Sequence, residues 1–231
     1  MLPARDTNRT EDAQENRDLR FGGIREAEPP ENFTFERDST YREILGEVQW
    51  HKLKPEIRKR FSLRPGKGAI IRYRGTMHTV HLSFMGWLFA QICRLIGTPL
   101  APRSGQDVPM EILLEPDEGG VAWVRIYKFP NQVEYTVRST KKRGKNNDLI
   151  EHIGCGFSMA LSLKVMHGDL FFISHAYKLK LLNFEIRIPD ILTPGRTTVS
   201  HEQITGPRFR FRLSVDHPLF GRTIFQEGEF K

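Results

Sequence analysis

Several features that mark common protein classes are missing from this chain of 231 residues. Its two cysteines, Cys93 and Cys155, are too few for a disulfide scaffold or a four-cysteine zinc site. No run of about 18 apolar residues occurs, which argues against a membrane-spanning helix. The amino terminus is polar and does not read as a secretory signal peptide. We therefore expect a cytoplasmic protein.

The motifs of common enzyme and cofactor sites are also absent. The chain has no phosphate-binding loop, no G-x-G-x-x-G, no G-x-S-x-G and no H-E-x-x-H. Its eight histidines show no metal-ligand spacing. His201 and Glu202 are adjacent on an expected strand, so they would point to opposite faces of it and could not readily chelate one ion together. We expect no cofactor and no metal.

Charge is distributed unevenly along the chain. Residues 1–40 hold ten acidic and six basic residues, whereas the remainder holds 29 basic and 18 acidic residues. A basic body suggests nucleic acid or an anionic membrane surface as partner. However, most basic residues occur singly, and the one cluster, at 141–145, lies in the stretch KKRGKNND, which is typical of a loop. We therefore favour a solvated surface and expect no nucleic-acid partner.

The amino-terminal segment differs in composition from the rest of the chain. Residues 1–38 contain few apolar residues, no sustained periodicity and the pair Pro29-Pro30. Such a segment cannot bury enough surface to offset the entropy of the chain. We predict a disordered tail over 1–38, followed by a single β-rich domain over 39–231.

Two helices are expected near the start of this domain. Tyr41 opens a stretch of helical spacing that Pro55 should break or restart. The second helix is predicted over 82–96, where one face collects Phe84, Trp87, Leu88, Ile92 and Leu95. We favour a helix buried across the sheet. The alternatives are a lid and a contact with a membrane surface.

From about residue 108 the apolar period changes from 3.6 to 2, as Met110, Ile112 and Leu114 illustrate. His167-Gly168 is expected to turn a hairpin. Turn signals at short spacing indicate roughly eight to ten strands, enough for a sheet to curl or close on itself. We predict an α+β fold, mainly β: a highly curved antiparallel sheet or calycin-like barrel with two N-terminal helices packed across it. A helix-grip lipid-transfer fold is the alternative.

One strand combines charge with aromatic rings. Trp123, Arg125 and Tyr127 share a face, a combination that can bind an anionic or planar ligand by hydrogen bonds and stacking. If that face points inward, the arginine needs a carboxylate partner, and Glu151 is the best candidate. The alternative is an exposed strand face. His217, next to a proline in a turn between two strands, is a further candidate, although turn histidines usually serve local hydrogen bonding.

The order of several short motifs resembles the bacterial family called domain of unknown function 4166, over about residues 41–230. The motifs that carry the resemblance are Trp123-x-Arg125, Glu151 with Gly154, Pro189 with Leu192 and Pro194, and His217-Pro218 with Gly221 and Gly228. Some members of that family carry this module behind a saccharopine-dehydrogenase-like domain. The present chain lacks the glycine-rich fingerprint of such a domain, so the resemblance implies no dehydrogenase activity.

Two classes of function follow from these observations. The first is a binding module that holds a small hydrophobic or amphipathic carboxylate in a barrel or half-barrel cavity. Its ligand site would be Trp123, Arg125, Tyr127, Glu151 and His217. The second is an enzyme that acts on a lipid-like or cyclic substrate, with Glu151 or His217 as general acid or base. We favour the binding module, because no nucleophile, base and orienting residue can be paired from their spacing.

Overall fold

The computed structural model describes residues 35–95, 100–130, 133–145, 147–182 and 184–231. Most of the predicted tail, residues 1–34, lies outside these ranges. The helices are α2 (Thr40–Leu45), α3 (Glu47–Lys52), α4 (Pro55–Phe61), α5 (Phe84–Leu95) and the short 3-10 helix η2 (Asp190–Leu192). The strands are β1 (Phe35–Arg37), β2 (Leu63–Pro65), β3 (Ile71–Leu82), β4 (Gly105–Asp117), β5 (Gly120–Phe129), β6 (Val133–Arg143), β7 (Leu149–Gly154), β8 (Phe157–Met166), β9 (Asp169–Leu181), β10 (Phe184–Ile188), β11 (Arg196–Gln203), β12 (Phe209–His217) and β13 (Gly221–Phe230).

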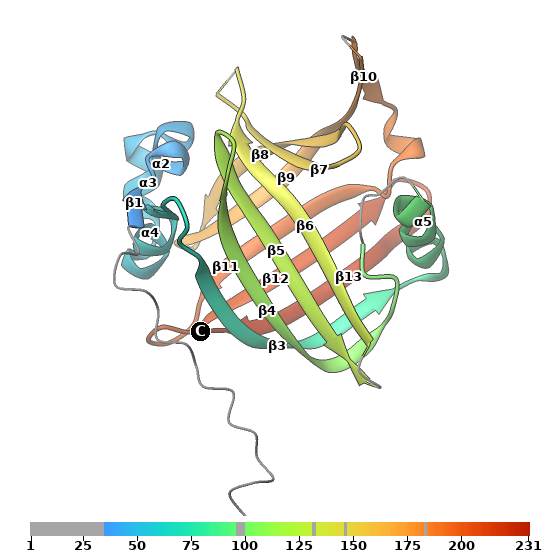
Figure 1. The fold of residues 1–231 in the computed structure, drawn as a ribbon, viewed down its shortest axis with the longest axis horizontal. Helices are drawn as coiled ribbons and strands as arrows, with labels where there is room; N and C mark the ends of the chain where they lie inside the picture. The colour runs from blue at the N-terminus through green and yellow to red at the C-terminus, as the bar shows by residue number, and fades with distance from the viewer. Residues whose placement is uncertain (1–34, 96–99, 131–132, 146, 183) are drawn as a thin grey trace, which may run out of the picture. The chain divides into compact units, whose positions relative to one another are not determined.

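The strands form a closed barrel, which confirms the predicted fold class. Within the described residues, ten antiparallel strands follow one another from β3 to β13, and β13 pairs with β3 to close the ring (Figure 1). Strand β10 stays outside the ring and extends one edge of β9. Four ladders shift register at β-bulges, which bend a sheet and help it to close.

Alternation of side chains sets the inside and outside of the barrel. On β4, Met110, Ile112 and Leu114 are buried in the interior, as their spacing predicts. The hairpin between β8 and β9 turns at His167 and Gly168, which both have positive φ, as two-residue turns of type I′ require. The predicted hairpin is therefore confirmed.

The first predicted helix is divided into three short ones. Pro55 begins α4, as expected, but a second break occurs at Gly46, whose φ of 73° and ψ of 158° end α2. The start of the described domain also lies earlier than position 38. Residues 35–37 form β1 and pair with β2, and the side chain of Asp38 accepts a hydrogen bond from the backbone N–H of Thr40.

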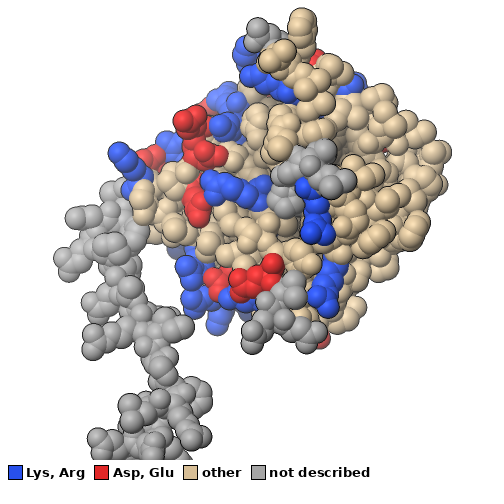
Figure 2. Space-filling model, turned by 45° about the vertical axis from the view of Figure 1, so that its right-hand side comes forward, with Lys and Arg blue, Asp and Glu red and all other residues tan. Residues whose placement is uncertain are grey.

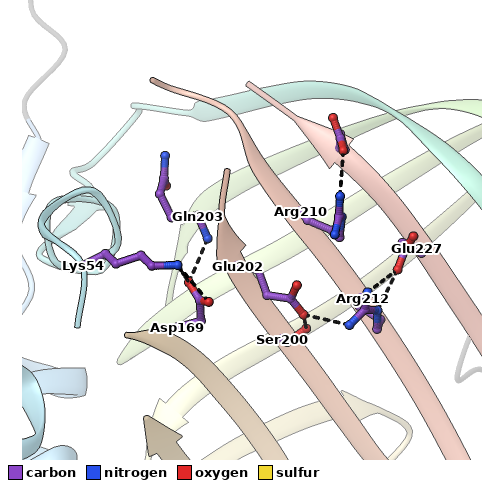
Figure 3. A network of polar contacts seen from close by, with 9 residues as sticks. Lys54, Asp169, Ser200, Glu202, Gln203, Arg210, Arg212 and Glu227 are labelled. Atoms are coloured by element: carbon purple, nitrogen blue, oxygen red, sulfur yellow. Dashed lines mark hydrogen bonds and ion pairs between the residues drawn. The ribbon is translucent and has the colours of Figure 1, made fainter. Parts of the chain in front are cut away.

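Helices α2 to α4 lie at one end of the barrel, where polar contacts attach them to the strands. Between α3 and α4, Lys54 forms an ion pair of 2.9 Å with Asp169 at the start of β9. The same carboxylate accepts the backbone N–H of Gln203 on β11 (Figure 3). One aspartate therefore joins a helical connection to two neighbouring strands.

Helix α5 begins two residues later than predicted, because β3 continues to pair with β13 as far as Leu82. It packs against β13 through its small residues. A Cβ atom on Gly86 would lie only 2.0 Å from the carbonyl oxygen of Thr223. The expectation that the Phe84 and Trp87 face is buried across the sheet is wrong, because both side chains are exposed. No helix of the described residues is both long and apolar enough to cross a bilayer.

The outer face of β11 to β13 carries the arginines that alternate with interior phenylalanines. Arg210 contacts Glu229, and Arg212 lies between Glu202 and Glu227 (Figure 3). These arginines are therefore paired with carboxylates on neighbouring strands. The pairing fits the solvated surface that their single spacing indicates.

Candidate ligand-binding cavity

A cavity of about 180 Å³ lies inside the barrel. Its wall comes mainly from the interior faces of β5 to β9, β11 and β12, and it is largely apolar. Phe89, Ile92 and Cys93 of α5 line it from one side, and Leu192 of η2 lines it from another. Because Ile92 and Leu192 are also exposed to solvent, they mark the mouth of the cavity.

A cluster of charged side chains stands in this apolar wall. One carboxylate oxygen of Glu151 accepts three contacts: 3.2 Å from Arg125 Nη2, 3.0 Å from Lys141 Nζ and 2.5 Å from the hydroxyl of Ser139. Arg125 also donates to the Ser139 hydroxyl at 3.0 Å. The side chains of Arg125, Lys141 and Glu151 are only 13%, 8% and 7% exposed. The expected proximity of Arg125 and Glu151 is thus confirmed.

Strand register brings these residues together from three consecutive strands. Lys141 on β6 lies directly opposite Glu151 on β7. On the other side of β6, Ser139 pairs with Trp123 of β5, two residues before Arg125. Since residues two apart share a face, all five side chains point into the barrel. The Lys141 ammonium lies 4.8 Å from the centre of the Trp123 ring, within range of a cation–π interaction.

Burial and pairing act in opposite directions on the acid of this cluster. Burial alone would raise the pKa of Glu151, but the charges of Lys141 and Arg125 and the hydrogen bond from Ser139 outweigh it, and the pKa falls to about 2. Burial lowers the pKa of Lys141 to about 8, and the attraction of Glu151 only partly offsets this effect. At neutral pH the cluster therefore holds two cations and one anion.

His201 lies at the aromatic end of the same cavity. Its ring is packed among five aromatic side chains: Phe61, Trp123, Phe172, Phe209 and Phe211. Burial, followed by the charges of Arg60, Lys141 and Arg125, holds the pKa of His201 well below its usual range, so the ring is neutral. Its Nδ1 atom is buried without a hydrogen-bond partner. As expected, Glu202 points the other way and contacts Arg212 outside the barrel.

Two of the predicted site residues lie apart from the cluster. Tyr127 is buried but does not line the cavity, and its hydroxyl donates to Gln226 at 2.8 Å. His217 stacks on Phe89 and Phe220 behind the cavity wall. Its Nδ1 accepts the backbone N–H of Leu219, and its Nε2 lies 3.2 Å from the carbonyl oxygen of Ile191. The structure thus groups Trp123, Arg125 and Glu151 and separates the other two.

The sequence reasoning missed Lys141, which it assigned to a solvated loop. Strand β6 runs through Arg143 because it pairs with β5 and β7 on its two sides, and Lys141 therefore faces inward. Continuing the alternation of Tyr135 and Val137 by two more steps would have found Ser139 and Lys141. As for metals, no group of three or more His, Cys, Asp or Glu side chains in the described ranges is arranged to hold an ion.

Fold and site together define a small antiparallel β-barrel with a cationic cluster in an apolar interior. The profile of the family described as domain of unknown function (DUF4166) matches residues 53–230. The chain belongs to this family, as its motifs indicate. Comparisons with curated proteins and with solved structures gave no match.

Proposed function

We propose that this protein binds an amphipathic carboxylate inside the barrel, with the acid group on Arg125 and Lys141. The observation that carries the proposal is a charge imbalance. Among the described residues that line the cavity, Glu151 is the only acid, and it faces two buried cations. An uncompensated charge in an apolar interior costs several kcal/mol. A ligand carboxylate would compensate it.

The size of the cavity limits how much of such a ligand is enclosed. An engineered cavity of about 150 Å³ accepts one benzene molecule, and pockets for drug-sized ligands are usually larger than about 300 Å³. A cavity of about 180 Å³ therefore holds the acid group and a short part of an aliphatic chain. The remainder of the chain would leave through the mouth between Ile92 and Leu192.

The geometry supports binding better than acid–base catalysis. A general base works best when its pKa lies near the working pH, whereas the pKa of Glu151 is lowered to about 2. His217 does not line the cavity, and both of its ring nitrogens contact backbone groups. Neither residue is placed as a catalyst that acts on a molecule in the cavity.

Calorimetric titration with laurate and with 1-dodecanol tests the proposal, because these ligands share a chain and differ in the acid group. Laurate should bind, and dodecanol should bind at least about tenfold more weakly, as expected for loss of a charged hydrogen bond. Arg125→Met and Lys141→Met should each weaken laurate binding by a similar factor.

Matched variants separate the site from general effects of charge. Arg212→Met removes a cation from the outer face, where Arg212 pairs with Glu202 and Glu227, and should leave laurate affinity unchanged. Glu151→Gln removes the internal competitor for the cations and should not weaken laurate binding. Equal affinity for laurate and dodecanol, or normal laurate binding by Arg125→Met, would refute the proposed site.

A further inference from the structure

Helix α5 presents an apolar face to solvent. Phe84, Trp87, Leu88 and Ile92 follow helical spacing, and all four are exposed, Phe84 to 76%. Gly86 and Ala90 on the opposite face are buried against the barrel. A helix on the surface of a soluble domain normally turns polar side chains outward. This helix therefore has an apolar face without a partner in the described structure.

Other exposed apolar side chains come from three further segments, namely the β9–β10 hairpin, η2 and the β12–β13 turn. These side chains are Leu181, Leu182, Phe184, Ile186, Ile191, Leu192, Leu219 and Phe220. Leu182 is 90% exposed and Leu192 is 70% exposed. Together with the four residues of α5, they are called the apolar rim below. Scattered exposed apolar residues are normal, but a group of this size on one side of a domain indicates an interaction site.

The rim forms one surface around the mouth of the cavity. Ile92 of α5 and Leu192 of η2 line the same cavity. The ring of His217 stacks on Phe89 at 5.5 Å and on Phe220 at 4.6 Å, which connects α5 to the β12–β13 turn. Helix α5 and β10 lie on the same side of the barrel (Figure 1). Figure 2, with this side turned forward, shows a broad surface without charged residues.

Basic side chains border the rim and outnumber the acidic ones. The exposed basic residues on its segments and flanking positions are Arg94, Lys180, Arg187, Arg196 and Arg222. The acidic residues in the described part of these segments are Glu185, Asp190 and Asp216. Two of the acids already have basic partners, because Glu185 pairs with Lys178 and Asp216 pairs with Arg222. When both pairs are set aside, Arg94, Lys180, Arg187 and Arg196 remain against Asp190. The border therefore complements an anionic surface.

We propose that the apolar rim docks on an anionic lipid bilayer, with the mouth of the cavity facing the lipids. A bilayer interface accepts apolar side chains to a depth of about 5–10 Å and attracts the basic residues beside them. The rim fits this partner because its side chains project from a helix, a hairpin and a turn around an opening.

Docking in this way would let an amphipathic ligand pass between bilayer and cavity without crossing water. The enclosed volume of about 180 Å³ takes the acid group, and the remaining chain would stay among lipid chains. This part of the inference rests on the proposed function. The docking itself does not, since it depends on the rim and its charged border.

Intrinsic fluorescence offers a direct test on the full chain. Of the three tryptophans, Trp50 and Trp123 are buried and Trp87 lies in the rim, so Trp87 reports on contact. Vesicles of phosphatidylcholine mixed with phosphatidylglycerol should shift the emission to the blue and sediment the protein. Phosphatidylcholine alone should bind more weakly, and added salt should reduce the difference by screening charge. Trp87→Phe should abolish most of the blue shift while sedimentation remains.

The variant Leu182→Glu/Phe184→Glu should lower vesicle binding by at least about tenfold, because each change places a charge where the bilayer would receive an apolar side chain. The matched control is Val48→Glu on α3, which is 73% exposed at the opposite end of the barrel and should leave vesicle binding unchanged.

Sedimentation velocity without lipid tests whether the rim binds a protein partner instead. If rim variants dissociate a self-associated protein and wild type does not bind vesicles, the rim is a protein interface and the bilayer proposal is overturned.

Failure of the docking and failure of the ligand site can be told apart. Leu182→Glu/Phe184→Glu should still bind laurate in the absence of vesicles, since neither residue lines the cavity. Vesicle binding without laurate binding would overturn the proposed function and leave the docking intact. If anionic vesicles neither shift the Trp87 emission nor sediment the protein, the docking is refuted, regardless of whether the protein binds laurate.

Discussion

Lys141 combines features that rarely occur together in a lysine side chain. It is buried, it lies over the Trp123 ring, and its ammonium is 3.0 Å from the Glu151 carboxylate. Burial lowers its pKa to about 8, so at neutral pH the side chain is mostly charged. Its charge is therefore available to an anion near neutrality and is lost in mildly alkaline solution.

This titration predicts a pH dependence of laurate binding. Binding of a carboxylate favours protonated Lys141, so affinity should be steady from about pH 6, where laurate is ionised, to about pH 8 and should fall above pH 8 by up to about tenfold per pH unit. Calorimetric titration across this range measures the effect. In Lys141→Arg the side chain stays charged, and the decline should disappear. A decline of equal size in Lys141→Arg would assign the titration to another group.

At the same scale, the sequence predicted part of the site. The pairing of Arg125 with Glu151 followed from alternation and from the need of a buried guanidinium for a counter-ion. The position of Lys141 was not predicted. It lies in a run of basic residues next to a glycine, and this local composition is typical of a loop. Burial of such a lysine depends on Glu151, which lies ten residues away on the next strand and can be placed only once the register is known.

Among the elements, α5 shows what periodicity can and cannot establish. The spacing of Phe84, Trp87, Leu88 and Ile92 predicted a helix with an apolar face, and both exist. The pattern did not indicate that the opposite face of the helix, rather than the apolar one, would pack against the barrel. That face uses Gly86 and Ala90, whose small size permits a close approach to β13 but produces little signal in a hydrophobic pattern. The strands were easier to predict, because every strand of a barrel turns alternate side chains towards the same interior.

Close contact at Gly86 can be tested by Gly86→Ala. In an unhindered helix this change stabilises by about 1 kcal/mol. Here the new Cβ would lie 2.0 Å from the Thr223 carbonyl oxygen, so α5 must move away. We expect a net loss of about 1–3 kcal/mol, seen as a lower Tm. Gln91→Ala, on a half-exposed position of the same helix, is the control and should leave Tm nearly unchanged. An increase of Tm in Gly86→Ala would contradict this packing.

For the whole molecule, the composition of the amino-terminal segment predicts that it adds little to stability. Deleting residues 1–34 should change Tm by less than about 3 °C, which corresponds to less than about 1 kcal/mol for a chain of this size. Deleting residues 1–38 should lower Tm more, because it also removes β1 and the Asp38 contact with Thr40. Thermal unfolding of both truncated proteins measures the difference. A large fall for the shorter deletion would show that residues 1–34 stabilise the barrel.

Closure of the ring has a consequence for how the chain folds. Every neighbouring pair from β3 to β9 is consecutive in sequence, but the seam joins β13 to β3 across about 150 residues. Such a distant pairing forms slowly, because the chain must lose the conformational entropy of a long loop before any stabilising contact forms between the two strands. During synthesis, β3 and β12 therefore keep unpaired edges until the last strand has emerged. The edge of β3 is therefore open to edge-to-edge aggregation while residues 83–220 are synthesised.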